Sequence, residues 1–520
     1  MTKTSLLLAL ILNLMLVALT VSGVSYTPWL ALETLFLWGL FAALRPGTLQ
    51  RQLAMAAGLT YAFVATLVVV DLLVQQSLGR PLNLYLELGV AGAAYHLLHT
   101  NLGAILAVAV LLLVLAMLIA LGMLFASLLQ RLAHHTPRQA PRLLIAAAVG
   151  LTGLTLALPA PIAATGAAVL GKQVTLAADT HDATRSFQQS IERGQRVDTR
   201  ALDRLAGKDV ILGFVESYGI SALTDPRYGP RILPRLEQME TALRARGLHL
   251  VSGRLTSPVQ GGQSWLAHLT LLSGQWVDSQ LDYDILLSSR HTTLIDDMKQ
   301  TGHNTVAVMP AITRPWPEGR RFGYDRIYDA DAMGYQGPPF NWVTMPDQYT
   351  WSWFEQELRR PSPQPLFAEM ALISSHAPWV PILPVLDDWS AIGNGKVYDT
   401  WRDSGEAPAS LWRDPDRVRA HYSQALDYAL EVITGYADQF VDDNTLLIIV
   451  GDHQPAPLIT GDNASRDSVI HIISADPALV EPFLHAGLPG FQAGALPDLD
   501  TTGMPMDRFR RVFQDIFSGN

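Results

Sequence analysis

The chain up to about Ala164 is dominated by long apolar stretches, and these constrain the fold more than any other feature. A helix that crosses a bilayer needs about 20 mostly apolar residues. Five stretches approach that length with few charges inside, although the second is short and carries Glu33. We therefore predict an α-helical membrane domain over residues 1–165 with five spans, which are Leu6–Val24, Trp29–Leu44, Leu53–Val74, Ala104–Leu129 and Leu143–Ala163.

The basic residues of the connecting loops predict how this domain is oriented. In a five-span topology nearly all of them fall on one side, and only Arg80 lies in the short loops opposite. Basic loops stay in the cytoplasm, so we expect a cytoplasmic N-terminus and a multi-pass protein of the inner (plasma) membrane. Everything beyond the fifth span is then periplasmic or otherwise extracytoplasmic. The basic side carries Lys3, Arg45, Arg51, Arg131, Arg138 and Arg142.

Beyond the apolar half, the sequence becomes that of a soluble protein. Residues 166–208 are polar with helix-forming runs, and we predict a helical linker there. From residue 209 to 520, short β-branched runs alternate with amphipathic segments, a pattern typical of an α/β domain. We expect a mostly parallel central sheet flanked by helices. Its clearest strands are Asp209–Val215, Thr305–Met309, Leu366–Ile373, Leu446–Val450 and Val469–Ile473.

Polar residues follow two of these strands at the point where each ends. The first strand stops at Glu216, and the strand Leu446–Val450 stops at Gly451 followed by Asp452 and His453. Ligand sites of open α/β sheets lie beyond the carboxyl ends of the strands. Carboxylate oxygens and an imidazole nitrogen suit a divalent cation such as manganese, zinc or magnesium. The net charge of -10 offers no basic surface for nucleic acid, and the lack of cysteine excludes thiolate ligands.

Ser264 is the candidate nucleophile. It follows a glycine-rich turn and opens a predicted short helix, where free N–H groups and the helix dipole favour a phosphoryl anion. An N-terminal cap is the alternative role for this serine. On the helix, Trp265, Leu269 and Leu272 share one face and are expected to pack inward. His268, one turn on, fits either packing or catalysis.

A histidine after a third strand completes the candidate residues from the sequence itself. His376 follows Leu366–Ile373 and precedes Ala-Pro-Trp. A histidine there could protonate a leaving oxygen or bind a substrate phosphate, or it could be structural. His471, by contrast, lies inside the strand Val469–Ile473 and is interpreted as structural.

These elements, in this order, resemble the sulfatase-like branch of the alkaline-phosphatase superfamily, and especially lipoteichoic acid synthases and phosphoglycerol and phosphoethanolamine transferases. The resemblance implies a sulfatase-like catalytic domain with one divalent metal, manganese first and zinc or magnesium as alternatives. It implies that Ser264 is the nucleophile and that His376 binds substrate. It extends the substrate-binding role to Trp316 and Arg314, with Arg320 or Arg321 as alternatives. The implied metal ligands are Glu216, Ser264, Asp452 and His453.

The activity implied is the metal-dependent transfer of a phospho-alcohol head group from an anionic membrane phospholipid to an envelope glycan or lipid, through a covalent Ser264 intermediate. Phosphoglycerol is the first choice, because phosphoethanolamine transferases are commonly rich in cysteine and this chain has none. Three alternatives stay open, which are phosphoethanolamine transfer, hydrolysis of the phosphodiesterase or sulfatase type, and a non-catalytic membrane scaffold. A true sulfatase needs Cys/Ser-x-Pro-x-Arg, whereas Ser264 is followed by Trp-Leu-Ala-His.

Two features depart from the family pattern. The nucleophile is serine where the transferases usually have threonine, and the residues after Asp452-His453 are Gln-Pro-Ala-Pro. The remainder of the chain to Asn520 matches the pattern less well, so acceptor recognition is open.

Overall fold

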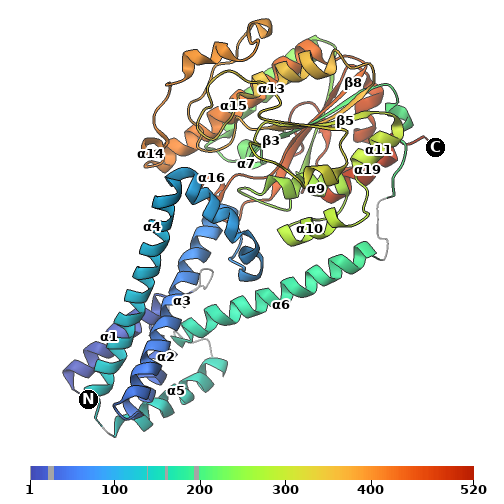
Figure 1. Cartoon of the computed structure of the whole chain (residues 1–520). Coiled ribbons are helices and arrows are strands. Elements are labelled where there is room, and N and C mark those ends of the chain that lie inside the picture. Colours follow the sequence, from blue (N-terminus) through green and yellow to red (C-terminus); the bar gives the residue numbers. More distant parts are fainter. Residues whose placement is uncertain (1, 21–27, 138, 158–161, 193–197, 520) are drawn as a thin grey trace. The chain divides into compact units, whose positions relative to one another are not determined.

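The computed structural model describes residues 2–20, 28–137, 139–157, 162–192 and 198–519, and the remaining residues are drawn as a grey trace in Figure 1. The chain forms two compact units. The first comprises Met1–Gln75 and Arg80–Arg185, and the second comprises Gln76–Gly79 and Ser186–Asn520.

The N-terminal unit is built from helices. Its α3 and α4 approach closely where Gly58 meets Gly122, because a Cβ on Gly58 would lie only 2.1 Å from the Gly122 carbonyl oxygen. Next to this contact, the rings of Tyr61 and Phe125 stack with centroids 4.3 Å apart. Small residues at such crossings let two apolar helices pack backbone to backbone. The helices are α1 (Lys3–Val17), α2 (Leu32–Ala43), α3 (Thr48–Leu78), α4 (Leu84–His134), α5 (Ala140–Ala157) and α6 (Thr165–Glu192).

Two of the five predicted spans correspond to helices that are long and apolar enough to cross a membrane. Among the described residues these are Thr48–Leu78 and the Leu102–His134 part of α4. The helices at the other three positions have apolar segments of 10–17 residues. Residues 21–24 of the first predicted span and 158–161 of the fifth lie outside the described residues. A membrane domain is thus supported, and the count of five spans stays a prediction.

Glu33, the one acidic residue in the second predicted span, has a structural partner. Its carboxylate accepts hydrogen bonds from the backbone N–H groups of Thr165 (3.2 Å) and Ala167 (3.1 Å). These donors belong to the first turn of α6, which has no intrahelical acceptors of its own. A negative charge at this end also complements the helix dipole. Glu33 therefore caps the helix that occupies most of the predicted linker.

The second unit contains a nine-stranded sheet. All five predicted strands are present, but the prediction of a mostly parallel sheet is wrong, because the sheet is mixed. The run β8–β3–β7–β5–β6 is parallel, whereas β9 pairs antiparallel with β8 and β4, and β10 pairs antiparallel with β4. The order is β10 (Gln492–Ala493), β4 (His249–Thr256), β9 (Asp467–Ser474), β8 (Thr445–Gly451), β3 (Asp209–Val215), β7 (Leu366–Leu372), β5 (Asn304–Met309) and β6 (Arg326–Asp329), and β11 (Met504–Pro505) pairs with β4.

The connection from β8 to β9 explains the change of direction. It contains only the single-turn helix α16 (Pro457–Thr460). A parallel strand is usually reached through a crossover that contains a long helix, and no such helix lies in the described stretch between Gly451 and Asp467. The chain returns as β9 alongside β8 in the opposite direction.

Helices cover both faces of the sheet (Figure 1). Along β3, Ile211 and Val215 pack into one apolar layer, while Val210, Leu212 and Phe214 pack into the other. Residues from α8 (Gly229–Ala245), α13 (Asp347–Trp353) and α15 (Pro415–Phe440) belong to the first layer, and residues from α9 (Ser264–Ser273), α11 (Leu294–Thr301) and α19 (Phe509–Phe517) to the second. Besides α16, the further α-helices of this unit are α7 (Ser221–Thr224), α10 (Gln280–Ser288), α12 (Gly319–Phe322), α14 (Pro408–Leu411), α17 (Pro477–Val480) and α18 (Pro482–His485).

A buried ion pair ties the C-terminal helix to the second layer. Arg510 of α19 donates from Nε to Asp297 Oδ2 of α11 at 2.8 Å, and both side chains are fully buried. Arg510 also donates to the carbonyl oxygen of Ser273, at 3.2 Å, where α9 ends. One side chain thus links three helices of the layer that carries Ser264.

Candidate active site

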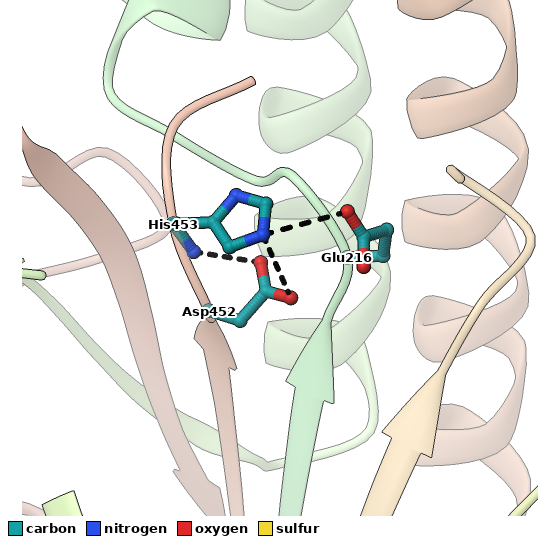
Figure 2. Close-up of side chains that lie close together, drawn as sticks. All are labelled: Glu216, Asp452 and His453. Atoms are coloured by element: carbon teal, nitrogen blue, oxygen red, sulfur yellow. Dashed lines mark hydrogen bonds and ion pairs between the residues drawn. The ribbon is translucent and has the colours of Figure 1, made fainter. Parts of the chain in front are cut away.

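Glu216 and Asp452 lie side by side because β3 and β8 are neighbouring parallel strands. Each carboxylate follows the last residues of its strand, and β7, which precedes His376, flanks β3 on its other side. Glu216, Asp452 and His376 therefore lie at the same carboxyl edge of the sheet, where ligands of open α/β sheets bind. Figure 2 shows Glu216, Asp452 and His453 facing one another.

Asp452 is oriented by the main chain. Its Oδ1 accepts hydrogen bonds from the backbone N–H groups of Ser217 (2.8 Å) and His453 (2.6 Å). The other oxygen, Oδ2, lies 3.6 Å from Nε2 of His453 (Figure 2). Because Oδ1 is occupied, Oδ2 is the oxygen that faces the cluster.

His453 presents a lone pair to the same point. Its Nδ1 lies 2.9 Å from the carbonyl oxygen of Gln454, and since a carbonyl only accepts, Nδ1 carries the proton. Nε2 is then the free acceptor, 3.7 Å from Glu216 Oε1. In metal-bound histidines, the ring nitrogen that does not bind the metal usually donates to a carbonyl or carboxylate, as Nδ1 of His453 does here.

The three residues fit a divalent cation. Ligand atoms of Glu216, Asp452 and His453 all lie within 4.8 Å of one another. Carboxylate and imidazole ligands occur in sites for more than one of manganese, zinc and magnesium. The two carboxylates and one imidazole therefore do not select among these metals.

The protonation equilibria of the cluster reflect this concentration of charge. Burial raises the pKa of Asp452 to about 6, and the neighbouring Glu216 adds to the rise. Burial alone would lower the pKa of the His453 imidazole, but the carboxylates of Asp452 and Glu216 raise it above its ordinary value. Burial likewise opposes the shift at Glu216, where His376 and His453 lower the pKa of the carboxyl group. A positive charge among these groups therefore stabilises the carboxylates in their ionised form.

Ser264 stands at the first position of α9 and points at the cluster. Its Oγ lies 3.3 Å from Glu216 Oε2 and 3.2 Å from His453 Nε2. Gln263, with φ of 65°, occupies the capping position, so the N-cap alternative for Ser264 is wrong. The helix packs as predicted through Leu269 and Leu272, but Trp265 is 42% exposed, contrary to the expectation that it packs inward.

His376 lines the same cavity as Ser264, Glu216 and Asp452. Its ring stacks on Trp342 with centroids 3.6 Å apart, and its Nδ1 lies 2.6 Å from the carbonyl oxygen of Ala377. The proton is again on Nδ1, which leaves Nε2 available in the cavity.

The two remaining predicted substrate residues lie elsewhere. Trp316 is half-buried in a second pocket, which shares Trp265, His268 and Ala311 with the cavity of Ser264. Arg314 is exposed, and it is not among the described residues that line either pocket. The structure therefore brings Trp316 next to the site and leaves Arg314 outside it.

Sequence reasoning missed several residues that shape the site. Ser217, at φ 57°, donates from its hydroxyl to Glu216 Oε1 at 2.7 Å. Glu369, buried in the middle of β7, binds Nδ1 of His268 at 2.7 Å and accepts from the Tyr324 hydroxyl. A lone carboxylate inside the apolar run of β7 was a signal that could have found Glu369.

His471 is structural, as its position in β9 suggested. Its two ring nitrogens lie 3.0 Å from the Tyr218 hydroxyl and 2.7 Å from the Ser252 hydroxyl. Burial lowers the pKa of this imidazole to about 3, so it stays neutral at physiological pH.

Comparisons with known proteins identify a matching family model and similar solved structures. The sulfatase family model matches residues 193–468. Similar solved structures include the lipoteichoic acid synthase LtaP from Listeria monocytogenes, with 14% identity, coverage of 56% of this chain and 71% of that one, and a TM-score of 0.37. The phosphoglycerol transferase GacH from Streptococcus pyogenes has 13% identity, coverage of 57% and 74%, and a TM-score of 0.36.

The lipooligosaccharide phosphoethanolamine transferase EptA from Neisseria meningitidis covers 99% of this chain and 94% of its own, at 14% identity and a TM-score of 0.48. The search of curated proteins found no match. Because the sulfatase model spans more than half of the sequence, this chain belongs to the sulfatase family.

Proposed function

We propose that this protein transfers the phospho-alcohol head group of a membrane phospholipid to a hydroxyl acceptor of the envelope, through a covalent intermediate on Ser264. The observation that carries the proposal is the position of Ser264 Oγ, 3.3 Å from Glu216 Oε2 and 3.2 Å from His453 Nε2. A serine so close to a metal-type donor cluster is typical of an activated nucleophile.

Glu216, Asp452 and His453 would hold the divalent metal, with Ser264 as a fourth ligand, and manganese is our first choice. A divalent cation at that point supplies charge that lowers the proton affinity of the serine hydroxyl and neutralises phosphoryl oxygens.

The chain's own residues then account for two displacements. Ser264 Oγ releases its proton to solvent and attacks phosphorus as an alkoxide, so a serine–phosphorus bond forms while the bond to the diacylglycerol oxygen breaks. That oxygen takes up a proton from Nε2 of His376, on the wall of the same cavity, with the imidazole in its doubly protonated form. The acceptor hydroxyl next attacks phosphorus and gives its proton to His376, which frees Ser264. Water in place of the acceptor would give hydrolysis.

The setting of the reaction follows from the N-terminal half. We propose that the apolar helices anchor the enzyme in the inner membrane, with the catalytic unit on the extracytoplasmic side where the lipid donor is concentrated. The acceptor is an envelope glycan or lipid. The residues after Ser264 do not include the Pro and Arg that direct sulfatase maturation, so the nucleophile works as an unmodified serine.

The test is peptide mass spectrometry of the full-length protein after incubation with mixed phospholipids and a divalent metal. We expect a phospho-head-group adduct on Ser264 and release of diacylglycerol, and Ser264→Ala should abolish both. A Ser264→Ala protein that still releases diacylglycerol at the normal rate would refute the proposal. A non-catalytic scaffold would give no adduct and bind no stoichiometric metal.

A further inference from the structure

A second pocket of about 380 Å³ adjoins the cavity of Ser264 and carries groups that the mechanism does not use. The two share Trp265 and His268 as wall residues, so a molecule bound at Ser264 can extend into this pocket. Its lining comes from α9, α10, β5, β7, α12 and the segment between β5 and α12. The rings and carboxylates that line it are Trp265, Tyr283, Trp316, Phe322, Glu318 and Glu369.

Aromatic rings form most of the wall and are held in place by one another. Phe322 lies 5.6 Å from Trp316 and 6.2 Å from Tyr283, measured between ring centroids. Trp265 is 42% exposed, yet its Nε1 donates to Gln280 Oε1 at 2.9 Å, which fixes the indole beside the pocket. Faces of such rings attract cations through their quadrupoles.

The polar groups of the pocket are acidic. The Glu318 carboxylate makes no hydrogen bond or ion pair with any residue that the structure describes, and it is half-buried. Glu369 is bonded to His268 and Tyr324. Apart from His268, the described residues that line the pocket offer no positively charged group, since none is lysine or arginine.

The two carboxylates also act on the phenol of Tyr283, which lines the same pocket. Burial is the main cause that raises its pKa, and the charges of Glu318 and Glu369 add to the rise. A negative potential inside aromatic walls disfavours an anion or a neutral polyol and favours a cation, because a desolvated charge needs an opposite charge nearby.

We propose that this pocket binds a positively charged ammonium at the alcohol end of the transferred head group. The inference rests on the proposed transfer through Ser264 and names its substrate class, an amino-alcohol phosphate such as phosphoethanolamine or phosphocholine. The phosphate lies at Ser264, and the two carbons of the amino alcohol pass Trp265 and His268 to place the ammonium between the rings and Glu318. The phosphoglycerol prediction, which came from the lack of cysteine, gives way to the amine alternative.

The experiment measures donor choice in the full-length protein in detergent micelles with manganese. Phosphatidylethanolamine and phosphatidylglycerol are supplied singly and as an equimolar mixture, and the mass of the Ser264 adduct identifies the group transferred. We expect the ethanolamine adduct to dominate in the mixture. Glu318→Gln should lower the ethanolamine rate by about tenfold, the value of one hydrogen bond to a charged group, and leave the glycerol rate near its starting value.

Glu237→Gln on α8 is the matched control, since Glu237 is exposed and lies outside the pocket. It should leave the donor ratio unchanged. A glycerol adduct that dominates in the wild-type protein would overturn the ammonium pocket while supporting the transfer reaction. An unchanged donor ratio in a folded Glu318→Gln protein would overturn it as well.

Calorimetric binding of O-phosphoethanolamine and glycerol phosphate separates the two proposals further. Tighter binding of O-phosphoethanolamine that is lost in Glu318→Gln, in a protein that forms no adduct, would support the pocket and refute the transfer. Equal binding of both would overturn the pocket.

Discussion

Replacing Ser217 by alanine should weaken metal binding without touching any proposed ligand. The Ser217 hydroxyl donates to Glu216 Oε1 at 2.7 Å, and the serine is only 6% exposed. A hydrogen bond to a charged group contributes about 1.5–3 kcal/mol. Lost in full, it corresponds to about a 10- to 100-fold weaker metal affinity, which is also the effect usual for groups that orient a ligand.

The backbone at Ser217 allows a second comparison. Its φ of 57° lies in the left-handed region, which costs about 1–2 kcal/mol for residues other than glycine. Ser217→Gly should therefore lose metal affinity as Ser217→Ala does, yet unfold at a higher temperature than Ser217→Ala. Metal titration by competition with a fluorescent chelator gives the affinity, and thermal denaturation without metal gives the stability.

Ser375→Ala is the matched control for this pair. Its hydroxyl donates to the backbone carbonyl oxygen of Glu216 at 2.6 Å and not to the carboxylate. We expect its metal affinity to stay near the wild-type value. If Ser217→Ala binds metal as tightly as the wild type, or if Ser375→Ala loses as much affinity, the idea that Ser217 orients the Glu216 carboxylate is wrong.

Two further predictions concern stability. Arg510→Met should destabilise the catalytic unit by about 3–5 kcal/mol in chemical denaturation, because it leaves Asp297 buried without its cation. Adding Asp297→Leu should recover part of the lost stability. A double mutant that recovers none of it would contradict this account. Burial raises the pKa of Asp347 from 3.8 to about 6, so the native state holds the proton more tightly, and stability should fall by about 3 kcal/mol as pH rises through this range. Asp347→Asn should lack this loss, and parallel pH profiles of the melting temperature for both proteins would refute the assignment.

The parts of the site that could be predicted from the sequence are those with local signals. Each of the strands that end at Glu216 and Asp452 is a buried apolar run followed by a polar stop, and in a parallel sheet such stops meet at one edge. Ser264 follows Gly261-Gly262, and the positive φ of both glycines and of Gln263 turns the chain into α9.

The parts that could not be predicted depend on distant partners. The sequence of β4, His249–Thr256, mixes polar and apolar residues and gives no clear strand pattern. Its strand conformation depends on antiparallel pairing with β9. Glu369 and His268 are 101 residues apart, and no local pattern indicates that they bond. The acidic pocket is of the same kind, since α9, α10, β7 and the α12 segment meet only in the folded chain.

The way the two carboxylates are held bears on how the site tolerates mutation. Asp452 Oδ1 is fixed by two main-chain N–H groups, which every non-proline residue supplies, so substitutions at positions 217 and 453 leave that support intact while the backbone is kept. The Glu216 carboxylate depends instead on side-chain hydroxyls, with Ser217 on Oε1 and the proposed nucleophile Ser264 on Oε2. In a lineage that relaxes selection on this enzyme, the orientation of Glu216 would therefore be lost before that of Asp452, and position 217 would be the first place to look for it.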